Sequence, residues 1–175
     1  MVGRIKLAWW REALEALDRT PAPAEPLLQK LQADVLPRGV DGAELARMEE
    51  GWVLLLSDAP LTNEELDAHA RLRGGVLFRA SARLLGGAAV GVEQAGEIWA
   101  LADLARHSGD AQDQASAIAA AGEREGPERW PVALRPLGML FALARRDLEQ
   151  KRPRWETQGS PRRMVRMLRL RLTGR

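Results

Sequence analysis

The stretch "LTNEELDAHARLRGGVLFRASARLLGG", residues 61–87, decides the fold class of this chain. Thr62 and Glu65 have the spacing of a capping box, in which two side chains satisfy backbone N–H groups at the start of a helix. The pair Gly86 and Gly87 marks the end, because glycine readily adopts the left-handed conformation that closes many helices. Between these signals apolar residues recur at helical spacing. The stretch therefore predicts one long helix.

Two glycines in the middle of this predicted helix need a reason. Gly74 and Gly75 each cost about 1 kcal/mol relative to alanine in a helix interior. We expect either close packing against a neighbouring helix or a kink at this point.

Helical patterns fill the rest of the chain as well. No stretch alternates as a strand would, and no fixed-period repeat occurs. The predicted fold is therefore all-α, a single bundle of seven or eight helices. One helix is expected to begin with Asp41 as its N-cap, with Glu44 completing a second capping box. The expected helices cover residues 3–18, 25–35, 41–56, 61–87, 90–109, 110–122, 128–150 and 159–172.

The composition excludes several classes of protein. Without cysteine the chain has no disulfide framework and no thiolate metal site. Its apolar runs fall short of the roughly 20 residues that span a membrane, and its start lacks a signal-peptide cleavage site. With no tyrosine and two phenylalanines, it lacks the aromatic platforms of single-stranded nucleic-acid binders. We expect a cytoplasmic protein with no nucleic-acid partner, and peripheral attachment to the inner membrane remains open.

The first helix, "KLAWWREALEAL" at residues 6–17, is unusually apolar around its circumference. Its apolar positions span an arc of roughly 200°, about twice that of an ordinary surface helix. This width predicts an inner helix with neighbours on two sides, in which Trp9 and Trp10 anchor the core.

Basic side chains interrupt the apolar face of the long helix. His69, Arg73 and Arg83 project within that face, where an unpaired charge is costly. One interpretation is a basic lining of an internal cavity that holds an anion such as a diphosphate. The alternative is that the two arginines extend to the rim and that His69 bonds a backbone carbonyl.

Other polar residues are candidates for a binding role. Glu49 and Glu50 could bind a cation, although an acidic pair in a helix usually lies in solvent. Asp103 and Arg106 have the spacing of a surface ion pair, with a role in ligand binding as the alternative. The chain has no metalloprotease, phosphate-loop, dinucleotide or nucleophile-elbow motif, so we predict no catalytic residue and no metal ligand.

The chain ends in a strongly basic segment. Residues 151–175 hold nine Lys or Arg and one acid, a charge of +8, so the net charge of +2 leaves −6 for residues 1–150. We therefore divide the chain into a helical domain, 1–158, and a basic amphipathic helix, 159–175, with Ser160 as N-cap and Pro161 in the first turn. The helix either docks its apolar stripe on the acidic body, which we favour, or lies on an anionic membrane. The stripe is Pro161, Val165, Leu168 and Leu172, and the membrane contacts would be Arg162, Arg163, Arg166 and Arg169.

Several stretches occur in an order typical of one enzyme family. "KLAWWREALEAL", a proline-rich turn and "EPLLQKL" come first, then residues 61–87, then "AGEIWALADLARH". Over roughly residues 4–150 the chain resembles the squalene/phytoene synthase family, the head-to-head prenyltransferases. It is most similar to the short bacterial members and to the mitochondrial complex I assembly factor of that family. The resemblance implies an isoprenoid-synthase bundle around a central cavity, here N-terminally shortened.

The resemblance also implies a chemistry, from which this chain departs. Active members join two prenyl diphosphates with Mg²⁺ held by two aspartate-rich motifs. The first motif is expected upstream of "LAWW", where this chain has no room for it. In the second, "RDxxxD", Arg106 matches the arginine, but His107 and Ala111 stand where the aspartates belong.

Three functions follow. The first is a non-catalytic family member that binds a prenyl diphosphate, another lipid-like ligand or a partner protein. The second is an active prenyltransferase that uses Mg²⁺, either with an upstream segment missing from this chain or with substitute acids such as Glu49, Glu50 and Asp103. The third is an assembly factor at a membrane surface. The sequence predicts no particular oligomeric state.

Overall fold

The computed structural model describes residues 2–57, 59–149 and 155–175, and every regular element in these ranges is helical. The segments α4, η4 and α5 run on as one helix, so the nine α elements make eight helices, as predicted. The elements are α1 (Val2–Ala16), α2 (Pro26–Lys30), η1 (Leu31–Val35), η2 (Leu36–Arg38), α3 (Gly42–Val53), η3 (Leu54–Leu56), α4 (Asn63–His69), η4 (Ala70–Gly75), α5 (Val76–Leu84), α6 (Val92–His107), α7 (Ala111–Gly122), η5 (Val132–Leu134), α8 (Arg135–Glu149) and α9 (Pro161–Thr173).

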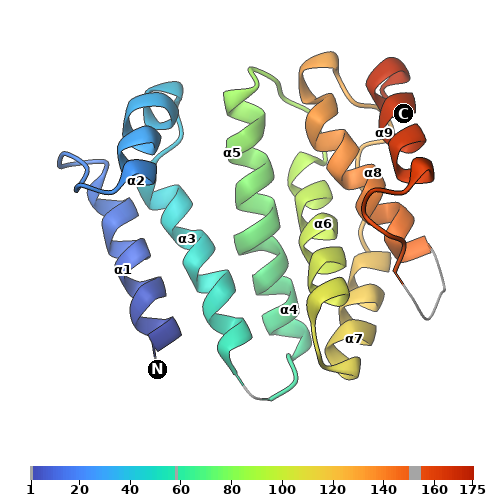
Figure 1. Ribbon diagram of the computed structural model, residues 1–175, viewed down its shortest axis with the longest axis horizontal. Coiled ribbons are helices and arrows are strands. Elements are labelled where there is room, and N and C mark those ends of the chain that lie inside the picture. Colours follow the sequence, from blue (N-terminus) through green and yellow to red (C-terminus); the bar gives the residue numbers. More distant parts are fainter. Residues whose placement is uncertain (1, 58, 150–154) are drawn as a thin grey trace.

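The helices lie side by side, largely in chain order (Figure 1). From α1 the row passes through α3, the α4–η4–α5 helix, α6 and α8 to α9, and α7 packs on α6. Helices α1 and α9 therefore lie at opposite ends of the molecule. Within the described ranges, no helix is both long and apolar enough to cross a bilayer.

The ends of the long helix follow the sequence signals. Thr62 and Glu65 form the predicted capping box, and Gly86 closes the helix with a positive φ of 67°. The second capping box was a wrong prediction, since Asp41 makes no capping hydrogen bond. Instead, the backbone N–H of Gly42 donates to the Asp18 carboxylate at 2.6 Å, so that α3 is capped by a residue in the turn after α1.

Close packing explains one of the two internal glycines. A Cβ on Gly74 would overlap the backbone carbonyl of Gly96 in α6, and one on Gly96 would overlap Gly74 in return. By contrast, a Cβ on Gly75 would meet its nearest neighbour, the Glu97 side chain, at 3.8 Å. The crossing of η4 with α6 is thus a backbone-to-backbone contact, and it fixes the centre of the row.

Helix α1 corrects the prediction of an inner helix. It packs on α3 at one end of the row (Figure 1), so part of its wide apolar arc is left uncovered. Ile5 is 66% exposed and Trp9 45% exposed, while Trp10 is half-buried and meets the Trp9 ring edge-on at 5.1 Å. Trp9 is therefore not a core anchor.

Candidate ligand-binding site

A cavity of about 490 Å³ lies where the C-terminal ends of α3 and α6 meet the α4–η4 helix. Its volume falls in the range of small-molecule pockets. One part of its lining is apolar and the other is polar. The apolar part includes Leu54, Leu55, Leu61 and Leu104, and the polar part includes His69, Arg73, Asp103 and His107.

His69, the last residue of α4, is fully buried in this lining. Its Nδ1 lies 2.9 Å from the carbonyl oxygen of Gly51, which only accepts, so Nδ1 carries the proton. Burial lowers the pKa of His69 below its ordinary value of 6.5, and the Arg73 charge lowers this pKa further. The ring is then neutral at pH 7, and its Nε2 is an acceptor. That atom is buried and has no hydrogen-bond partner in the described part of the chain.

The close fit of α3 against η4 makes this arrangement possible. A Cβ on Gly51 would lie 3.3 Å from the backbone N of Arg73, which is tighter than ordinary van der Waals contact. The Gly51 carbonyl therefore reaches the His69 ring. Segment η4, which begins directly after His69, has the wider π-type turn that often occurs at functional sites.

Arg73 is held in place on three sides. Its guanidinium lies 4.4 Å from the ring centroid of Trp52 and 4.9 Å from that of Trp99. Its Nη1 pairs with Asp103 Oδ2 at 2.7 Å, and only 12% of the Arg73 side chain is exposed. Asp103 in turn lies 3.2 Å from Nδ1 of the largely exposed His107.

These contacts set the charge of the polar end. Arg73 and Asp103 neutralise each other, and His69 is uncharged near neutral pH. Asp110 and Asp113 also line the cavity, so its acids outnumber its one arginine. The cavity therefore combines an apolar wall with an acidic polar end, rather than the strongly basic lining that a diphosphate needs.

Arg83 does not belong to this site, which corrects the basic lining predicted from the sequence. It pairs with Glu44 of α3, as does Arg79, and both arginines line a different cavity of about 440 Å³. Ten residues separate Arg73 from Arg83, so the long helix carries them past different neighbours. Of the three predicted basic residues, the structure brings together His69 and Arg73.

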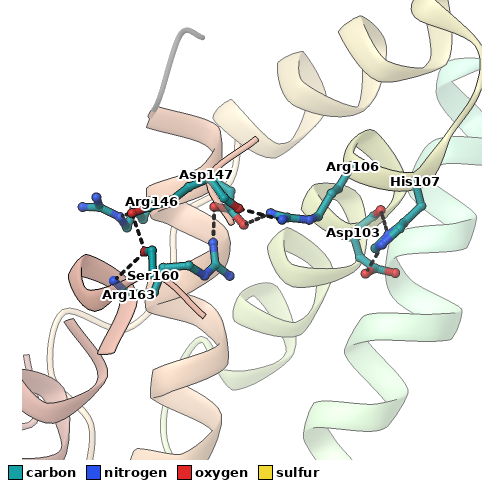
Figure 2. Close-up of polar contacts among 8 residues, drawn as sticks. Asp103, Arg106, His107, Arg146, Asp147, Ser160 and Arg163 are labelled. Carbon is teal, nitrogen blue, oxygen red and sulfur yellow. Dashed lines mark hydrogen bonds and ion pairs between the residues drawn. The ribbon is translucent and has the colours of Figure 1, made fainter. Parts of the chain in front are cut away.

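Asp103 and Arg106 do not pair with each other, so the predicted surface ion pair is wrong. Figure 2 shows Asp103 beside His107, while Arg106 extends the other way to Asp147 of α8 at 3.2 Å. A second arginine, Arg163 of α9, also pairs with Asp147, and both partners of that pair are buried. The i, i+3 spacing allows Asp103 and Arg106 to pair within α6, but side chains of other helices pair with both residues instead.

Glu49 and Glu50 of α3 point to different environments. Glu49 is buried and Glu50 is exposed. Nowhere in the described ranges do three His, Cys, Asp or Glu side chains form a group suited to a metal ion. The Mg²⁺ of the prenyltransferase interpretation does not fit these residues, because the two glutamates diverge and Asp103 is already paired with Arg73.

The basic helix α9 docks, but with the opposite face from the one predicted. Arg163 and Leu170 face the body and are buried, whereas Val165, Leu168 and Leu172 are exposed. An ion pair sets this orientation of α9, because Arg163 pairs with the buried Asp147 of α8.

Sequence reasoning missed two aromatic members of the site. Trp99 lies one turn before Asp103 on α6, so the helical spacing places the two on the same side of the helix. Both of them contact Arg73. Trp52 lies on α3, a different helix from Arg73, and no local pattern indicated that the two would meet.

In comparisons with known proteins, no family model, no curated protein and no solved structure matches this chain. The resemblance to the squalene/phytoene synthase family therefore stays a prediction.

Proposed function

We propose that this chain is a non-catalytic member of the squalene/phytoene synthase family that holds a prenyl-chain lipid with a hydroxyl head group. One observation carries the proposal. It is the buried, unpartnered Nε2 acceptor of His69, a residue that lines a cavity with an apolar wall and a polar end. A buried polar atom without a partner costs about 1–3 kcal/mol, and a ligand that satisfies it recovers this free energy.

The tautomer of His69 selects the head group. Because Nδ1 donates to Gly51, Nε2 accepts a hydrogen bond and therefore favours a ligand with an O–H donor. An ionised diphosphate has only acceptors. It would also face the Asp103 carboxylate, which lies in the same lining. A prenyl alcohol fits this end better than a prenyl diphosphate.

The remainder of the cavity suits a hydrocarbon chain. Leucines from η3, α6 and the segment before α4 supply apolar surface, and the ring of Trp52 lies beside them. Burying such a chain is favourable by about 25 cal/mol per Å² of apolar area removed from water. The likeness to prenyl-handling proteins suggests a branched isoprenoid chain rather than a straight one.

Catalysis is not part of the proposal because the carboxylates that it needs are replaced. Prenyl transfer requires clustered acids to hold Mg²⁺ against the diphosphates. In the second motif, His107 and Ala111 occupy the aspartate positions. The alternative of an active prenyltransferase would need acids outside the ones described above.

Equilibrium dialysis with labelled farnesol and farnesyl diphosphate tests the proposal. Ala59 is an exposed lining residue, so Ala59→Trp fills the cavity mouth with little effect on folding. Ala24→Trp, on an exposed loop, is the matched control. We expect saturable farnesol binding at one site, at least tenfold weaker in Ala59→Trp, unchanged in Ala24→Trp, and at least tenfold tighter than diphosphate binding.

Two results would contradict the proposal. One is farnesol binding that does not saturate or that both tryptophan variants weaken alike. The other is pyrophosphate release from farnesyl diphosphate with Mg²⁺, which would establish the enzyme interpretation instead.

A further inference from the structure

Helix α9 lies at the outer end of the molecule (Figure 1). It presents an apolar stripe to solvent. The stripe consists of Val165, Leu168 and Leu172, at i, i+3 and i+7, which places them on one side of the helix. Their exposed fractions are 66%, 55% and 68%, and the neighbouring Met164 is 59% exposed. Together these side chains form a continuous apolar surface that is open to solvent.

The stripe is held outward by firm contacts on the opposite side of α9. Leu170 lies in the core cluster that joins α5, α6 and α8. The backbone N–H of Trp130 donates to Gly174 O at 2.8 Å, and Arg135 Nη1 donates to Arg171 O at 2.6 Å. Rotating α9 to bury the stripe would break these bonds and the buried pair of Arg163 with Asp147.

Arginines flank the stripe on both edges. At about 100° per residue, Arg162 and Arg169 lie on one edge and Arg171 on the other. All three are exposed, and none has a side-chain partner within the described ranges. Residues 157–175 hold six arginines and no acid. Arg163 does not belong to this set because it is buried. It is therefore not one of the membrane contacts, although the sequence predicted it as one.

We infer that α9 is a docking surface for an anionic lipid membrane. A shallow apolar stripe between rows of arginine is the pattern of helices that lie in a bilayer interface, where the stems bury and the charges meet phosphate groups. Charge complementarity favours this occupant, because every charged side chain on α9 is an arginine. The rest of this chain, residues 1–150, is acidic and would attract the flanks, yet α9 docks on it with the stripe turned away.

Vesicle co-sedimentation tests the inference with the full chain. The vesicles are phosphatidylcholine alone, or with 30% phosphatidylserine, at low and high salt. The stripe variant is Leu168→Glu, and the flank variant is Arg162→Gln with Arg171→Gln. Val90, which is 98% exposed on the loop before α6, provides the apolar control Val90→Glu. Arg19→Gln with Arg38→Gln, two exposed arginines elsewhere, provides the charge control.

We expect binding to the anionic vesicles only, weakened by salt. Each arginine near an anionic surface contributes enough that the flank variant should bind about 30-fold more weakly. Leu168→Glu should also lose binding, while both controls should bind as the unaltered chain does. Circular dichroism checks that the variants are folded, which the exposure of every substituted side chain favours.

Three outcomes would overturn the inference. The first is no binding of the unaltered chain to anionic vesicles. The second is an equal loss in the flank variant and the charge control, which would mean attraction by net charge alone. The third is a dimer, measured by light scattering, that Leu168→Glu converts to a monomer, because the stripe would then belong to a second copy. None of these outcomes bears on farnesol binding, so the two proposals fail separately.

Discussion

Gly74 and Gly96 touch backbone to backbone where the long helix crosses α6, and neither position has room for a Cβ. This contact brings α6 close enough to η4 for Asp103 and Trp99 to reach Arg73. The candidate site therefore depends on a crossing that two side-chain-free residues make possible.

Adjacent glycines at this crossing give a matched pair of variants. Gly74→Ala should destabilise the protein by about 3 kcal/mol, because the methyl group forces the helices apart. Gly75→Ala should be neutral or stabilising by up to about 1 kcal/mol, since it removes a helix-interior glycine without a clash. Urea denaturation measures both. Equal effects of the two changes would show that the close crossing is absent.

The cap on α3 comes from a residue 24 positions away in the chain. Asp18→Ala removes the acceptor for the Gly42 and Ala43 N–H groups and should cost about 1 kcal/mol. Asp41→Ala, at the position favoured by the sequence pattern, should change stability little, because its side chain makes no cap. Thermal unfolding of the two variants distinguishes them, and a larger loss in Asp41→Ala would refute the assignment.

Asp147 joins three helices through two arginines, as Figure 2 shows. Asp147→Ala leaves Arg163 buried without a counter-charge and should cost about 3 kcal/mol or more. The loosened α9 should also exchange its amide hydrogens faster than α3 does. As a control, Asp34→Ala removes the exposed pair with Lys30 and should have little effect on either measurement. Unchanged exchange in α9 would show that the buried pair does not hold it.

Stability should depend on pH through His69. Burial lowers the pKa of His69 in the folded state below its ordinary 6.5, so near pH 6 the unfolded chain binds a proton that the folded chain does not. The free energy of unfolding should thus be constant above about pH 7 and fall as the pH drops below 6.5, by at most about 1.4 kcal/mol per pH unit.

Denaturation between pH 5.5 and 7.5 measures this effect, before most carboxylates titrate. The variant His107→Gln removes the second histidine and should keep the pH dependence. A flat profile in that variant would assign the effect to His107 and contradict a buried, neutral His69.

Local signals predicted much of the fold from the sequence. Thr62 with Glu65 and Ser160 with Pro161 begin their helices as expected, because a cap involves residues within one turn. The choice between partners in different helices could not be predicted in this way. Glu44 bonds Arg79 rather than its own helix start, and this contact spans 35 residues.

The candidate site was predictable only in part, for the same reason. His69 and Arg73 lie one turn apart on one helix, so their joint placement followed from helical spacing. The neutralisation of Arg73 by Asp103 and the acceptor state of His69 depend on helix crossings. Likewise, the outward face of α9 is set by the buried Asp147, which no pattern within residues 159–175 contains.

Nitrogen-15 NMR of the His69 imidazole, in protein labelled at histidine, tests the proposed site most directly. The His107→Gln variant assigns the signals, since one histidine then remains. At pH 7.5 we expect a protonated Nδ1 and an unprotonated Nε2 whose resonance shifts when farnesol is added and stays in place with farnesyl diphosphate. A protonated Nε2, or an Nε2 resonance that farnesol does not move, would contradict the proposed role of His69.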